Sequence, residues 1–107
     1  MMVKNHILMM SIGSIYNHIL IAQAADTLLT MDNIKASFVI ARIDNEVVAT
    51  SARSLGEINV QVIMEKLEGG GHLTNAATQL KDKTTEEVEQ LLLTAINESI
   101  TDGKSEQ

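Results

Sequence analysis

Three consecutive glycines followed by a histidine, Gly69-Gly70-Gly71-His72, are the residues of this sequence best suited to binding chemistry. Glycine has no Cβ, so successive backbone N–H groups can turn toward one point and a ligand can approach the main chain closely. The His72 ring can donate a hydrogen bond to a phosphate oxygen and is positive when protonated. The pattern therefore indicates a phosphate-binding turn. The alternative is that Gly69 is the C-cap of the preceding helix and that His72 is an ordinary surface residue.

A second candidate for binding is Arg53 with Ser54, which follow an apolar run and should emerge at the end of a strand. An arginine in that place is usually solvated or half of a weak surface ion pair. If one nucleotide contacts both Arg53 and the glycine run, the two segments must lie side by side in the fold.

The elements that position these residues follow from hydrophobic periodicity. We expect strands over residues 3–12, 35–43, 46–52 and 75–80, and helices over residues 19–31, 59–67 and 84–100. Asn59 is the expected N-cap of the second helix. The run Phe38-Val39-Ile40-Ala41 is apolar at both odd and even positions, so both faces of the strand would be apolar, which is typical of an inner strand.

The last helix has the clearest local signal, because Thr84 with Glu87 three residues later forms a capping box. Its predicted buried face is Val88, Leu91, Leu92, Ala95, Ile96 and Ile100. The fold class is therefore α/β, a mixed sheet flanked by about three helices. Residues 1–100 form one domain, and residues 101–107 should be a disordered tail because their polar composition cannot bury enough area.

Composition excludes several classes of function. The net charge of −6 opposes an extended grip on DNA or RNA, and one Phe, one Tyr and no Trp make stacking of many bases improbable. There is no cysteine, and the three histidines do not recur with carboxylates at ligand spacing, so we predict neither a metal site nor a catalytic residue in this chain. Apolar runs fall far short of the ~20 residues needed to span a bilayer, so we expect no membrane contact, and the absence of cysteine fits a cytoplasmic domain.

The segments Ser51-Ala52-Arg53-Ser54 and Gly69-Gly70-Gly71-His72, with Ala76-Ala77 just after, resemble the DHH-associated C-terminal domain of DHH phosphodiesterases. The longer stretches 51–64 and 69–80 are most similar to the cyclic di-AMP phosphodiesterases of staphylococci and bacilli. The resemblance covers about residues 20–80 and is weaker in the last helix.

The resemblance implies a binding module for cyclic di-AMP or its linear product. Arg53 and the segment Gly69, Gly70, Gly71 and His72 would contact phosphate or base, with Ser54, Asn59 and Asn75 as further candidates. A separate DHH domain, absent here, would hold two manganese ions and perform the hydrolysis, in a parent enzyme anchored to the membrane. This chain itself would need no cofactor, and its missing parts indicate a fragment, a cloned domain or a truncated gene product.

Two departures from the family pattern limit the transfer. Glu68 stands where relatives often extend the glycine run, and residues 10–17 look shorter than the family's first strand-to-helix connection. Other ligands within the superfamily are short oligonucleotides, as for nano-RNases and RecJ-like exonucleases, or a tRNA end. A function of another class is an interaction domain, such as a homodimer, with an idle pocket.

Overall fold

The computed structural model describes the backbone of residues 2–105 and the side chains of residues 2–100. The elements are β1 (Met2–Lys4), β2 (Ile7–Ile15), α1 (His18–Leu28), β3 (Ala36–Arg42), β4 (Val47–Ser54), α2 (Val60–Glu65), β5 (Gly70–His72), β6 (Asn75–Lys81) and α3 (Thr85–Ser105). The strands form one sheet in the order β1-β2-β3-β4-β6-β5. Among the strands of the described residues, β2 and β3 pair in parallel and the other pairings are antiparallel, so the sheet is mixed and the predicted α/β class is confirmed.

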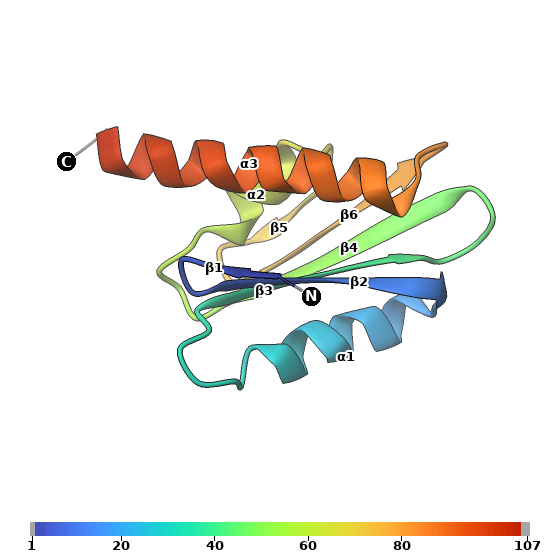
Figure 1. Cartoon of the computed structure of the whole chain (residues 1–107), viewed down its shortest axis with the longest axis horizontal. Helices are drawn as coiled ribbons and strands as arrows, with labels where there is room; N and C mark the ends of the chain where they lie inside the picture. The colour runs from blue at the N-terminus through green and yellow to red at the C-terminus, as the bar shows by residue number, and fades with distance from the viewer. Residues whose placement is uncertain (1, 106–107) are drawn as a thin grey trace.

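Helices cover both faces of the sheet, but unequally (Figure 1). The closed face, as we call it, lies under α2 and α3; within residues 2–105, the open face is covered by α1 alone, which packs against β3 and β4. On β6, burial alternates strictly along the strand, since every second side chain is buried and the others are exposed. The open face is therefore bare over β6.

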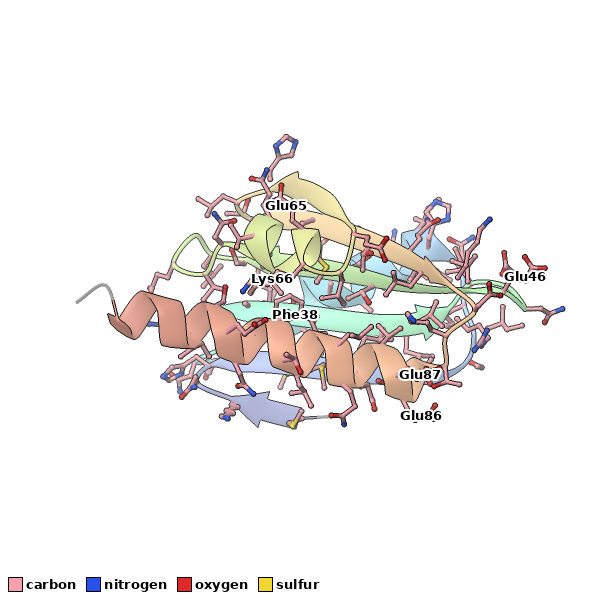
Figure 2. The ribbon with its side chains drawn as sticks, turned by 90° about the horizontal axis from the view of Figure 1, so that it is seen from above. Phe38, Glu46, Glu65, Lys66, Glu86 and Glu87 are labelled. Atoms are coloured by element: carbon pink, nitrogen blue, oxygen red, sulfur yellow. The ribbon has the colours of Figure 1, made fainter. Side chains whose placement is uncertain are left out.

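β3 is buried on both faces, as its uninterrupted apolar run predicts. Phe38 and Ile40 belong to the closed-face core, whereas Val39 and Ala41 pack with α1. Figure 2 looks onto the closed face and shows Phe38 under the layer formed by α2 and α3. The closed-face core is aliphatic apart from Phe38 and includes Ile7, Met9, Val48, Val60, Ile63, Met64, Leu67, Val88, Leu92 and Ile96.

Side-chain caps fix where two helices begin. Asn59 caps α2 by accepting from the backbone N–H groups of Gln61 and Val62 at 3.0 and 3.3 Å. Thr84 and Glu87 form the predicted capping box, in which the Thr84 N–H donates to Glu87 Oε1 at 2.9 Å and the Glu87 N–H donates to Thr84 Oγ1 at 3.1 Å. The helix starts that were predicted from local sequence are thus confirmed.

Three features differ from the sequence-based prediction. Residues 3–12 are not one strand, because Asn5 and His6 adopt positive φ and turn the chain into a β1–β2 hairpin. Leu91 is 43% exposed, since α3 buries a narrower stripe than predicted. The backbone of α3 is helical to Ser105, where a tail from residue 101 was expected, and residues 106–107 of that tail lie outside the described residues.

Within residues 2–105, none of the three helices is both long enough and apolar enough to cross a bilayer.

Candidate functional site

Three of the predicted site residues form a row across neighbouring strands. Arg53 of β4 pairs with Asn75 of β6, and Asn75 pairs with His72 of β5. Directly opposed residues of antiparallel strands project to the same face, so all three side chains lie on the open face. With strands ~4.8 Å apart, the Cα atoms of Arg53 and His72 are about 10 Å apart. The two segments share one surface, although β6 separates them.

The row closes one end of a shallow groove between α1 and the uncovered strands. The groove is lined by His18 and Ala22 of α1, by residues of β4 and by residues of β6, namely Ala49, Thr50, Ser51, Arg53, Asn75, Ala77, Thr78 and Gln79. Alanine and serine side chains make up most of its floor, so the backbone of the sheet is accessible from this side. Such a floor gives a flat ligand room to lie close to the strands.

Arg53 is held in place by its neighbours. Its Nε donates to Asp26 Oδ1 at 2.8 Å and its Nη1 donates to the Ala52 carbonyl at 2.9 Å. The Arg53 side chain is only 15% exposed, whereas that of Asp26 is 62% exposed. The guanidinium has further N–H groups beyond these two bonds, and they can serve an anion in the groove. The Arg53 side chain is therefore held in one orientation by Asp26 and the Ala52 carbonyl, at the edge of the groove.

The glycine run leads into the edge strand β5, which contains Gly70 and Gly71, and does not form the convergent phosphate-binding turn that we expected. A Cβ at Gly69 would collide with the Ala77 carbonyl, and a Cβ at Gly71, whose φ is 143°, would collide with the backbone of β6. These two glycines are explained by the close approach of β5 to β6. Gly70 differs, because a Cβ there would meet nothing within 4 Å. Since Gly70 pairs with Ala77, that free space lies on the open face.

The hydrogen bonds at the C-terminus of α2 test the alternative interpretation, in which Gly69 is the C-cap of that helix. The Gly69 N–H donates to the Met64 carbonyl at 2.8 Å and the Glu68 N–H donates to the Glu65 carbonyl at 3.2 Å, the pattern of a Schellman C-cap. The residue in the left-handed conformation is Glu68, with φ of 63°, and not Gly69. Glu68 thus occupies the position that glycine usually takes in this motif.

Ser54 and Asn59 are not part of this row. Ser54 is the next residue along β4 after Arg53, so its side chain projects to the closed face, where its hydroxyl donates to the Leu73 carbonyl at 3.3 Å. Asn59 begins α2, which also lies on the closed face, and its Oδ1 caps that helix. Strand alternation and capping give both residues structural roles, and neither lies on the open face.

Two residues that line the groove, and one that contacts it, were missed from sequence. His18 and Asp26 lie on the side of α1 that faces β4, where Asp26 contacts Arg53, and Gln79 of β6 lines the groove with His18. The spacing of residues 18, 22 and 26 at i, i+4 and i+8 places them on one side of a helix, and residues 75, 77 and 79 share one face of a strand. These spacings could have shown that each set of residues shares one face of its element. They could not have shown that the helix face and the strand face lie against each other in the fold.

The described residues contain no group of three or more His, Asp or Glu able to hold a metal ion. The groove and the adjoining row offer hydrogen-bond donors, one guanidinium and two imidazoles, that of His18 in the groove and that of His72 in the row.

The profile of the DHHA1 domain matches residues 4–102 of this chain. The cyclic-di-AMP phosphodiesterase GdpP of Geobacillus thermodenitrificans is 57% identical over 92 residues, which cover 86% of this chain and 14% of that protein. GdpP of Bacillus subtilis is 57% identical over 88 residues, which cover 82% and 13%. The cyclic-di-AMP phosphodiesterase PdeA of Listeria monocytogenes is 58% identical over 82 residues, which cover 77% and 12%. The chain therefore spans only 12–14% of the length of these relatives.

Two solved structures share the fold. An exopolyphosphatase-related protein from Bacteroides fragilis superposes with a TM-score of 0.62 at 24% identity, covering 69% of this chain and 22% of the other. A pGpG-specific phosphodiesterase, PggH from Vibrio cholerae, superposes with a TM-score of 0.51 at 20% identity, covering 63% and 25%. Since the family match extends over nearly the whole chain, this chain belongs to the DHHA1 domain family and is homologous to the corresponding part of GdpP and PdeA.

Proposed function

We propose that this domain binds the phosphate and adenine of cyclic di-AMP or of its linear product, while a separate DHH domain of the parent protein hydrolyses the phosphodiester bond. The observation that carries the proposal is the row of Arg53, Asn75 and His72 on the open face. The ligand class is suggested by the names of the relatives, which are cyclic-di-AMP phosphodiesterases.

Each residue of the row has a definite part in this proposal. Arg53 donates charge-assisted hydrogen bonds to a phosphate oxygen, from an orientation that Asp26 maintains. Asn75 and His72 donate to the same phosphate or to the ribose from β6 and β5. Gly70 keeps the face clear, because any side chain there would enter the space that the ligand needs. We expect weak binding, since the net charge of −6 opposes an anion and half of the cleft belongs to another domain.

Hydrolysis is proposed to occur outside this chain. By the resemblance to DHH phosphodiesterases, the DHH domain of the parent enzyme would hold manganese and supply the metal-activated water. By the same resemblance, the parent protein is anchored to the membrane with this domain in the cytoplasm. The isolated chain should therefore hydrolyse neither cyclic di-AMP nor a linear dinucleotide, with or without manganese.

The test is an NMR titration of the isolated chain with AMP, which compares the variants Arg53→Ala, His72→Ala and Gly70→Ala with the unsubstituted chain. Hydrogen bonds to a charged group contribute about 1.5–3 kcal/mol, so Arg53→Ala should weaken binding about tenfold or more. Gly70→Ala should weaken it by steric exclusion, without unfolding the domain. Chemical-shift changes should cluster at the Arg53, Asn75 and His72 row.

Lys66→Ala is the matched control, because it also removes one positive charge but lies at the C-cap of α2, over the closed face (Figure 2). It should leave AMP binding unchanged. An equal loss in Lys66→Ala and Arg53→Ala would show that only overall charge matters, and shifts confined to β1 and β2 would place the site elsewhere.

The alternatives give different outcomes in the same assay. Tighter binding of a short oligonucleotide than of AMP or linear di-AMP would favour an oligonucleotide module. If sedimentation shows a homodimer that no nucleotide binds or alters, the domain is an interaction module and the proposal is wrong.

A further inference from the structure

The groove extends well beyond the phosphate-binding row. From the Arg53–Asn75 pair to the Ala49–Gln79 pair, each strand advances four residues, or about 13 Å. The wall of the groove, α1, has a similar length, because the helix rises about 12 Å over the eight residues between Asp26 and His18. Asp26 contacts Arg53 at one end, and so His18 lies toward Gln79 at the other. The groove is thus comparable in length with an extended nucleoside monophosphate.

The two ends of the groove differ in charge. Arg53 is the only lining residue with a permanent charge, and it lies at the end that carries the row. At the far end, His18 and Gln79 are exposed and polar and Ala49 is small and apolar, as are Ala22 and Ala77 between the ends. A phosphate prefers the charged end, whereas an uncharged planar base prefers the end that offers an apolar floor and hydrogen-bonding edges.

The side chains at the far end have the chemistry that recognises a base. An imidazole ring can stack on a nucleobase, as histidines do in proteins that bind single-stranded RNA. A glutamine amide presents a donor and an acceptor side by side, which match the N6 and N7 edge of adenine. His18 comes from a helix and Gln79 from a strand, so one can cover the face of a base while the other meets its edge.

We propose that His18 and Gln79 form a base-recognition end of the groove, in which His18 stacks on the adenine of a nucleoside 5′-phosphate and Gln79 hydrogen-bonds to its edge. This inference rests on the proposed function, because the phosphate must occupy the Arg53 end. It goes further by naming two residues that determine which nucleotide is preferred.

Ribose 5-phosphate separates the two claims, because it has the phosphate and the sugar of AMP but no base. In the domain without substitutions, AMP should bind about tenfold more tightly than ribose 5-phosphate, as expected for one stacked base. AMP should also bind several-fold more tightly than UMP, which lacks the N6 and N7 edge. His18→Ala and Gln79→Ala should each reduce the advantage of AMP while leaving the affinity for ribose 5-phosphate unchanged, and Gln79→Ala should also reduce the preference over UMP.

Gln90→Ala is the matched control for Gln79→Ala, since Gln90 is an exposed glutamine on α3, over the closed face. It should alter neither affinity. Equal binding of AMP and ribose 5-phosphate, or full AMP affinity in both groove variants, would overturn the base-recognition end while the phosphate site stands. If neither ligand binds, or if Arg53→Ala leaves ribose 5-phosphate binding intact, the phosphate site itself is wrong and the inference is overturned with it.

Discussion

The two faces of the sheet use alternate residues of the same strands for different purposes. The closed face presents large aliphatic side chains and Phe38 to α2 and α3. The open face presents small residues beneath α1 and, beyond that helix, the exposed side chains of β6. Burial on the closed face stabilises the domain, whereas small side chains on the open face leave a groove and give up part of that burial. The difference indicates that stability and binding can be changed separately in this fold.

The largest expected effect separates the faces most directly. Phe38→Ala should destabilise the domain by about 3–5 kcal/mol, because Phe38 is fully buried in the closed-face core. Asn75→Ala on the open face should change the free energy of unfolding by less than about 0.5 kcal/mol while weakening AMP binding. Urea unfolding followed by circular dichroism measures both variants. Equal destabilisation would contradict the division of roles.

A second comparison tests polar groups within the closed face. Thr78 and Thr50 are paired and both buried, but the Thr78 hydroxyl donates to the Leu67 carbonyl at 2.6 Å, whereas Thr50 Oγ1 has no partner among the described residues. Thr78→Val should therefore cost about 1–3 kcal/mol by leaving that carbonyl unpaired. Thr50→Val removes an unpaired hydroxyl at nearly constant shape, so it should be neutral or stabilising. Chemical denaturation measures the free energy of unfolding of both variants. A larger loss of stability in Thr50→Val than in Thr78→Val would mean that the Thr50 hydroxyl has a hydrogen-bond partner in solution.

A smaller effect is expected where α2 leads into the edge strand β5. Glu68 has a φ of 63°, in the left-handed region that costs a residue with a Cβ about 1 kcal/mol. Glu68→Gly should raise the free energy of unfolding by about that amount, less the entropy that glycine loses. Glu65→Gly is the control, because Glu65 lies within α2 and glycine there should destabilise (Figure 2). Destabilisation by both variants would show that the left-handed turn is relaxed with glutamate.

The smallest effect concerns pH and the start of α3. The hydrogen bond from the Thr84 backbone N–H lowers the pKa of Glu87 below its usual value of 4.5. A carboxylate with a lowered pKa stabilises the folded state above its unfolded value, and this contribution is lost as pH falls through the folded value. Glu87→Gln should therefore be less stable than the parent at pH 7, and the difference should shrink as pH falls below about 4. Thermal unfolding at pH 7 and pH 3 measures the stability difference between Glu87→Gln and the unsubstituted domain, with Glu86→Gln as the control. An equal difference at both pH values would exclude the charge of Glu87 as its cause.

Much of the fold could be predicted because its signals are local. The capping box of Thr84 and Glu87, the Asn59 cap and the apolar run around Phe38 each involve residues close together in the chain. Propensity and periodicity act at that range, so these elements were predicted correctly. The hairpin of β1 and β2 was missed because two non-glycine residues, Asn5 and His6, adopt positive φ there.

The site depends on pairings that no local pattern contains. Gly69 and Gly71 look like a phosphate-binding turn in the sequence, but in the fold both are packed against the backbone of β6, Gly71 within the edge strand β5 and Gly69 just before it. The bond between Arg53 and Asp26 joins residues 27 positions apart, and the register of β4 against β6 places Asn75 beside Arg53. The residue types and helix caps followed from the chain itself, because side-chain chemistry and capping act within a few residues. Which side chains meet in the groove was decided by packing, because strand register and the placement of α1 depend on contacts across the whole domain.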